Sequence, residues 1–329
     1  MRRAIWLLLS VFWLGLAGSA SAQDKFPSKP IKIVVPYVPG GGSDITARLI
    51  GDQMRQLLGQ PVLVENKPGA NGIVAIEELL RGKPDGYTLL IVNNTVGVLT
   101  PLQYPKQMRV NFEQAVAPVV RLAVLPQMLI ATTANFPPTT FAEFVAYAKA
   151  NPGKVRFGST GVGSFPHLDM EVLARRAGLD MIHIPNKSGA SGSIQDVVTG
   201  DVQVSGMNVA TGMPMVKAGK IRPLALGSEQ RLPEYPGVPT IAELGYPGAM
   251  SLQWFAFVAP AGVPNDVLSV LHNAAVQAMK APQVVEAFKK QMLLPKPSAS
   301  PEDAKAFLAG EFARMKQVLA EFPIQLEEN

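Results

Sequence analysis

The chain contains two glycine-rich stretches, Pro-Gly-Gly-Gly at residues 39–42 and Ser-Thr-Gly-Val-Gly-Ser at residues 159–164. Each follows a short apolar run of the kind that forms a β-strand. The runs cover residues 31–36 and 155–158, and each glycine stretch leads into a segment whose apolar residues recur at helical spacing. A chain that alternates strand, helix and strand pairs its strands in parallel beneath covering helices. The pattern therefore predicts an α/β fold in which the same unit occurs twice.

The two units are separated by apolar extended runs at residues 119–132 and 252–260, which lie where a chain would cross between two bodies and return. Residues 24–124 together with 250–329 are predicted to form lobe 1, and residues 125–249 lobe 2. Each lobe is expected to hold a mainly parallel sheet flanked by helices. Two crossing segments allow the lobes to close on a ligand by hinge bending.

The N-terminus has the order of a secretory signal. Met1-Arg2-Arg3 is positively charged, residues 4–16 are apolar, and small residues end at Ala20-Ser21-Ala22. The apolar run is short for a membrane span, although an uncleaved anchor is the alternative. We therefore predict that residues 1–22 are a signal peptide and that the mature chain is exported.

Composition excludes several classes of function. The formal net charge is +5, and the basic residues are scattered rather than gathered with aromatic residues, so no nucleic-acid partner is expected. The chain contains no cysteine, which excludes disulfides and thiolate chemistry. None of the common hydrolase, zinc-protease or nucleotide-binding motifs occurs. The chain is therefore not expected to be an enzyme or to bind a metal or cofactor, and a periplasmic hydrolase or lyase remains the alternative.

The glycine turns are the strongest candidates for a binding site. Glycine lets backbone N–H groups approach a ligand closely, and the first turn of a helix has free N–H donors and a positive dipole end. Ser43, Thr160 and Ser164 could add hydroxyl contacts. The alternative is that both turns are ordinary connections with small capping residues. Asp44 is interpreted as an N-cap, or alternatively as the partner of a ligand ammonium group.

Three further polar residues require a choice between two interpretations. Asn93 begins an Asn-Asn-Thr turn after the run at residues 87–92, which either faces the cleft or simply ends a strand. His167 either reaches the cleft or is a polar residue in the first turn of a helix. His183 lies in an apolar strand, where packing is favoured over ligand binding.

Several motifs in order give the chain a family resemblance. They include Pro36-Tyr37-Val38-Pro39 before the first glycines, Val64-Glu65-Asn66-Lys67-Pro68-Gly69, Pro84-Asp85-Gly86-Tyr87 and Ala259-Pro260-Ala261-Gly262. With these motifs the mature chain resembles, over nearly its whole length, the Bug-type extracytoplasmic receptors of tripartite tricarboxylate transporters.

The resemblance implies a type II periplasmic-binding fold, a location in the periplasm and a small carboxylate held between the lobes. It also implies membrane transporter subunits as partners and no cofactor, and we expect a monomer. A sensing subunit that presents its ligand to a signalling partner is the alternative role. Carried over by matching position, the binding candidates are Tyr37, Gly41, Gly42, Asp44, Asn93, Ser159, Thr160, Gly163, Ser164 and His167.

Two segments depart from the family pattern. Asn186-Lys187-Ser188-Gly189 stands where Tyr-Lys-Gly is usual, and Met207-Asn208 stands where Asp-Asn is usual. The loss of an acid at residue 207 suggests a less polar wall. The resulting hypothesis is a ligand without an amino group, with an apolar or aromatic body.

Overall fold

The computed structural model describes residues 25–108, 110–186, 189–250 and 252–322. The predicted signal peptide, residues 1–22, lies outside this range, as do Lys187 and Ser188 of the first departing segment. Within these ranges, none of the helices combines the length and apolar character needed to span a bilayer.

Strands and helices alternate along most of the chain. The strands are β1 (Ile31–Val35), β2 (Val62–Asn66), β3 (Thr88–Val92), β4 (Val116–Leu125), β5 (Gln127–Thr132), β6 (Val155–Ser159), β7 (Met181–Pro185), β8 (Val204–Asn208), β9 (Ile221–Gly227), β10 (Gln253–Pro260) and β11 (Leu294–Pro295). The longer helices are α2 (Gly42–Leu58), α3 (Ile73–Leu80), α7 (Phe141–Ala150), α8 (Phe165–Ala177), α9 (Gly189–Thr199), α10 (Val209–Lys217), α11 (Asn265–Ala278), α12 (Pro282–Lys290) and α13 (Pro301–Glu321). The short helical segments are η2 (Ala70–Gly72), η3 (Thr95–Leu99), α4 (Thr100–Gln103), α5 (Pro105–Met108) and α6 (Phe112–Ala115).

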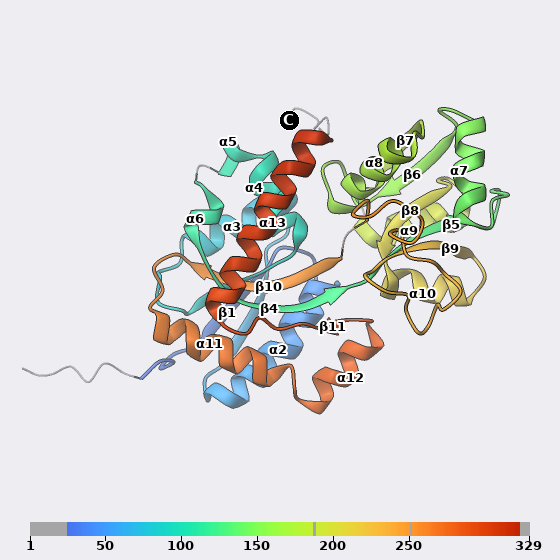
Figure 1. Ribbon diagram of the computed structural model, residues 1–329. Helices are drawn as coiled ribbons and strands as arrows, with labels where there is room; N and C mark the ends of the chain where they lie inside the picture. Colours follow the sequence, from blue (N-terminus) through green and yellow to red (C-terminus); the bar gives the residue numbers. More distant parts are fainter. Residues whose placement is uncertain (1–24, 109, 187–188, 251, 323–329) are drawn as a thin grey trace, which may run out of the picture.

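The strands form two sheets, and Figure 1 shows one body around each. The strand order is β11-β4-β10-β3-β1-β2 in the first sheet and β7-β6-β8-β5-β9 in the second. We call the body around the first sheet lobe 1 and the body around the second lobe 2. The expected parallel pairing occurs where strand, helix and strand alternate: β1 pairs with β2 and β3, and β6 with β7 and β8.

The strands at the crossing between lobes pair antiparallel, so both sheets are mixed and the prediction of mainly parallel sheets was wrong. β4 ends at Leu125, and after Pro126 the chain enters β5 of the other sheet, while β10 returns beside β4 and β3. The buried Asn94 fixes the start of β10, because its Oδ1 accepts from the Trp254 amide at 2.9 Å and its Nδ2 donates to the Leu252 carbonyl at 3.2 Å. Asn94 is therefore part of the crossing rather than of an open loop.

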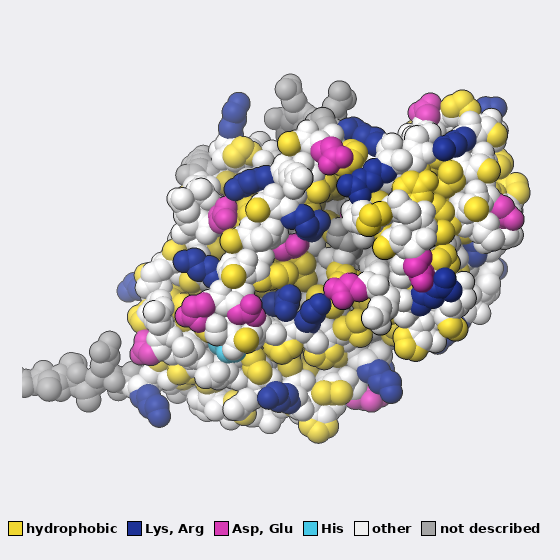
Figure 2. Space-filling model, in the orientation of Figure 1, with side chains coloured by type: hydrophobic (Ala, Val, Ile, Leu, Met, Phe, Trp, Pro, Cys, Tyr) yellow, Lys and Arg dark blue, Asp and Glu magenta, His cyan; other side chains and the backbone are white. Residues whose placement is uncertain are grey.

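The helices begin and end where local chemistry predicts. α2 buries an apolar side that includes Ile50 and Met54, and it ends at Gly59, whose φ of 67° is in the left-handed region that favours glycine. At the start of α13, Ser300 Oγ accepts from the Asp303 amide and Pro301 is the first helical residue, which is a typical helix start. α13 then packs across β4, and on the face shown in Figure 2 its basic and acidic side chains are interspersed.

Candidate functional site

The strand topology places both glycine turns at the edges where the sheets face the crossing. In lobe 1, β1 and β3 are parallel, and β3 ends beside the start of β10, which is where the chain returns from lobe 2. In lobe 2, the end of β8 at Asn208 pairs with Gln127, the first residue after the crossing, and β6 runs parallel to β8. The turns that follow β1 and β6 therefore both lie on the inter-lobe side.

The lobe 1 turn, residues 39–42, leaves the start of α2 without a side-chain cap. Gly41 is the N-cap with φ −81° and ψ 168°, and no side chain bonds the first helical amides. Gly40 has a φ of 90°, which requires glycine. In the described part of the chain, the consecutive amides of residues 41–44 donate to no protein acceptor. A row of free amides at the positive end of a 17-residue helix can bind an anion.

Asp44 is not the N-cap that the sequence suggested. It is the third residue of α2, and its buried carboxylate accepts from the Gly40 amide at 2.9 Å, from Asn66 Nδ2 at 2.9 Å and from Arg48. Burial alone would raise the pKa of Asp44, but the hydrogen bonds from Arg48, Gly40 and Asn66 outweigh it and lower the pKa. The carboxylate is therefore ionised, and its oxygens hold the glycine turn in shape.

Tyr37 and Asn93 form a polar pair at the ends of β1 and β3. Asn93 Nδ2 donates to the Tyr37 hydroxyl at 2.9 Å, and that hydroxyl lies 3.1 Å from Asn93 Oδ1. Asn93 Oδ1 also accepts from the Val96 amide at 3.0 Å, at the start of η3. Burial raises the pKa of Tyr37 to about 12, so its hydroxyl keeps its proton and can act as a donor.

The lobe 2 turn, residues 159–164, leaves α8 similarly uncapped. Ser164 is the N-cap, but its side chain caps no helical amide, and Pro166 in the first turn has no N–H to offer. The Ser164 hydroxyl is buried and has no hydrogen-bond partner within the described ranges. Thr160 is partly exposed in the same turn. Since buried hydroxyls are normally satisfied, the Ser164 hydroxyl is a candidate ligand contact.

The other predicted residues of lobe 2 bond within the lobe. The fully buried Ser159 hydroxyl accepts from the Gly161 amide at 3.1 Å and lies 2.7 Å from His183 Nε2. The Gly163 amide donates to His167 Nδ1 at 3.1 Å, and the His167 side chain is buried beneath the turn. His183 packs in β7, as expected. The structure thus groups Tyr37, Gly41, Gly42, Asn93, Thr160 and Ser164 at the inter-lobe edges and assigns Asp44, Ser159, Gly163 and His167 internal contacts.

The departure at residue 207 does not put an apolar side chain on the inter-lobe wall. Met207 is buried in a cluster that includes Met128 of β5 and Val209 of α10. The next residue, Asn208, caps α10 by accepting from the Thr211 amide at 2.9 Å. The prediction that the loss of an acid at residue 207 leaves a less polar inter-lobe wall was therefore wrong, because the side chain at this position faces the core.

Two residues that support the lobe 1 glycine turn were not predicted from the sequence. Arg48 and Asn66 both bond Asp44, and Asn66 also donates from Nδ2 to the Tyr37 carbonyl at 2.9 Å. The spacing of Asp44 and Arg48, four residues apart on a helix, was a usable signal. Asn66 had no such signal, because its contact depends on the parallel pairing of β1 and β2.

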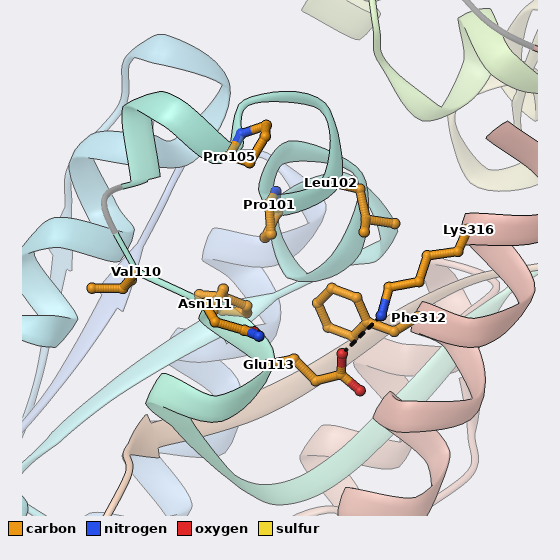
Figure 3. Close-up of a pocket in the computed structure, with 9 residues that line it drawn as sticks. Pro101, Leu102, Pro105, Val110, Asn111, Glu113, Phe312 and Lys316 are labelled. Carbon is orange, nitrogen blue, oxygen red and sulfur yellow. Dashed lines mark hydrogen bonds and ion pairs between the residues drawn. The ribbon is translucent and has the colours of Figure 1, made fainter. Parts of the chain in front are cut away.

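A separate pocket of ≈550 Å³ lies on lobe 1 between α4, α6 and α13 (Figure 3). Its lining is largely apolar, with Pro101, Leu102 and Phe312, and Lys316 in this lining pairs with Glu113 at 3.2 Å. None of the predicted binding residues lines it. Among the residues that the structure places, no cluster of His, Asp and Glu could hold a metal ion.

Comparison with known proteins identifies the family. Residues 46–324 match the model of the tripartite tricarboxylate transporter family receptor. The chain is 32% identical over 313 residues to Protein BugT of Bordetella pertussis, with 95% of each chain covered. Its fold matches R. palustris Rpa4515 with adipate, at a TM-score of 0.81 and 28% identity over 91% of this chain and 99% of that one.

A second solved structure, MatC from Rhodopseudomonas palustris with bound malate, matches at a TM-score of 0.78 and 28% identity. That match covers 89% of this chain and 100% of MatC. These matches confirm the expected α/β periplasmic-binding fold with two sheets. The chain belongs to the receptor family of the tripartite tricarboxylate transporters.

Proposed function

We propose that this receptor binds a small dicarboxylate between its lobes, with one carboxylate at the start of α2 and the other at the start of α8. The observation that carries the proposal is the row of four unbonded amides at residues 41–44, at the N-terminus of a long helix. The unpartnered Ser164 hydroxyl gives the second lobe a matching donor. Related receptors with adipate and with malate support a ligand of this class.

The ligand is inferred to lack an amino group. An ammonium group beside the lobe 1 turn would need a carboxylate, and the nearby Asp44 already bonds Gly40, Arg48 and Asn66. Moving Asp44 to a ligand would leave three donors without their acceptor. An unaminated acid is therefore inferred from the bonds of Asp44 and not from residue 207.

The cellular setting is proposed from the family and the N-terminus together. Residues 1–22 are removed on export, and the mature protein acts as a monomer in the periplasm, without enzymatic activity. Residues 24–124 and 250–329 move as one lobe and residues 125–249 as the other. The closed, loaded form delivers its ligand to the membrane subunits of a tripartite tricarboxylate transporter.

Calorimetry of the purified mature protein tests the ligand class. Succinate, malate and adipate form the test panel, with aspartate and glutamate as aminated counterparts and benzoate as an aromatic monocarboxylate. We expect at least one dicarboxylate to bind with micromolar or tighter affinity, and both amino acids and benzoate to bind at least tenfold more weakly. The proposal is contradicted if aspartate or glutamate binds more tightly than succinate, malate and adipate, or if none of these three unaminated dicarboxylates binds.

A further inference from the structure

Two histidines and a phenylalanine form a stack of rings beneath the lobe 2 glycine turn. The Phe157 and His183 ring centroids are 4.9 Å apart, and those of His183 and His167 are 3.7 Å apart with an angle of only 9° between their planes. Phe157 comes from β6, His183 from β7 and His167 from α8. The stack therefore ties together the three elements that surround the turn.

The two histidines hold the turn by its backbone. His167 Nδ1 accepts from the Gly163 amide at 3.1 Å. His183 Nε2 is hydrogen bonded at 2.7 Å to the Ser159 hydroxyl, which accepts from the Gly161 amide at 3.1 Å. Two amides of the turn are thus fixed by the stack, and their positions determine where the remaining amides and the Ser164 hydroxyl lie.

We infer that His167 and His183 are positioning residues for the lobe 2 turn, and that protonation of this pair releases the turn and weakens dicarboxylate binding. A protonated imidazole carries hydrogen on both ring nitrogens, so His167 Nδ1 could no longer accept from Gly163. The effect on affinity rests on the proposed function, whereas the response of the turn does not require a ligand.

The charged groups around the stack favour a proton on one ring over the other. Glu171 Oε1 lies 3.8 Å from His167 Nε2, and its other oxygen lies 3.7 Å from Arg175. A proton taken up by the pair is therefore better placed on His167 than on His183.

The remaining charged groups on the packed elements have other partners or face away. On α9, which packs on β6, the Asp196 carboxylate accepts from Asn186 Nδ2 at 2.7 Å. α8 packs on β6, β7 and β8, whose only charged or titratable side chains are Arg156 and His183. Arg156 is exposed on the opposite face of β6 from Phe157. On α8 itself, Asp169 acts on Arg314 of α13, and Arg176 donates to the Pro247 carbonyl.

Burial, together with the neighbouring His167, lowers the pKa of His183 from its ordinary value of 6.5 to about 4, and Glu171 opposes this only in part. The unfolded chain thus binds a proton on His183 below about pH 6.5, while the folded chain does so only near pH 4. The free energy of unfolding must therefore fall as the pH decreases through this interval. Burial thus keeps His183 neutral over most of this interval.

The test is an NMR titration of the ligand-free protein from pH 8 to pH 4. The chain has only 3 histidines, so each ring can be followed. His272 on α11, whose Nε2 bonds the Ser298 carbonyl, serves as the internal reference. We expect the Gly161 and Gly163 amide signals to shift together with the signals of the His167 ring. If the amides stay in place while the two rings titrate, the inference is wrong whatever the ligand proves to be.

Binding measurements on two matched variants complete the test. The dicarboxylate that binds most tightly in the calorimetric panel is measured at pH 7.5 and pH 5.5. His167→Asn keeps an acceptor near the position of Nδ1 but cannot be protonated, and His167→Phe keeps the stacked ring but has no acceptor. We expect the wild type to lose at least tenfold more affinity than His167→Asn on acidification, and His167→Phe to bind more weakly than His167→Asn at pH 7.5.

Protonation of the ligand affects every variant equally. The comparison between variants therefore isolates the effect on affinity of protonating the protein. Equal losses of affinity in the wild type and His167→Asn would overturn the inference and leave the proposed function standing. A wild type that binds no dicarboxylate at either pH would instead overturn the proposed function, and the ligand-free titration would still decide the role of the histidines.

Discussion

Replacing Gly41 by valine is expected to weaken dicarboxylate binding at least tenfold, or about 1.4 kcal/mol, while the protein still folds. The φ and ψ of Gly41 suit any residue, and an added Cβ would meet no protein atom within 4 Å. The new side chain would instead occupy the space in front of the free amides of residues 41–44. Calorimetry with the tightest-binding dicarboxylate measures the loss, and thermal unfolding checks the fold.

Gly41 is a better test position than its neighbour. A Cβ on Gly42 would lie 3.3 Å from the Phe255 ring, so a variant there would combine lost binding with disturbed packing on β10. Gly237→Val is the matched control, because Gly237 is an exposed lobe 2 loop glycine that also has open space around its Cβ position. If Gly41→Val binds as tightly as Gly237→Val, the start of α2 does not contact the ligand.

Replacing Asp44 by alanine is expected to reduce the free energy of unfolding by about 1–3 kcal/mol. The substitution leaves the Gly40 amide and Asn66 without an acceptor and removes the partner of Arg48. The control is Asp52→Ala, whose carboxylate is 57% exposed in a surface pair with Arg55 and should cost less than about 1 kcal/mol. Denaturant titration of both variants at pH 7 measures the difference.

The effect of Asp44 also has a defined pH dependence. Because the pKa of this carboxyl is lowered in the folded protein, its stabilising contribution is present above the ordinary value of 3.8 and is lost as the pH falls below it. The wild type and Asp44→Ala are therefore expected to converge in stability towards pH 3. A gap that stays constant from pH 7 to pH 3 would show that the ionised carboxylate does not hold the turn.

Local patterns were sufficient to predict most of the lobe 1 framework. The run at residues 31–36, the glycine turn and the helical segment after it all appear in the structure as β1, the turn and α2. These features depend on residues close together in the chain, such as apolar spacing and a left-handed C-cap. The antiparallel pairing of β4, β5 and β10 with their neighbours could not be predicted from the sequence, because it joins strands far apart in the chain.

The candidate site was predicted less completely than the fold. Gly41 and Gly42 could be predicted from their position before a helix alone, and their amides bond no acceptor among the described residues. Asp44, Ser159 and His167 were carried over from the family pattern by position, but residues of their own lobes bond them. Asn66 and His183 come from neighbouring strands, and no local spacing could show that Asn66 bonds Asp44 or that His183 stacks on His167.

A crystal structure of the protein with the dicarboxylate that binds most tightly tests the central claim most directly. We predict that one carboxylate accepts hydrogen bonds, at about 2.7–3.2 Å, from at least two of the amides of residues 41–44. The other carboxylate is predicted to lie against Ser164 and the first turn of α8. A ligand bound with both carboxylates away from the start of α2 would contradict the account.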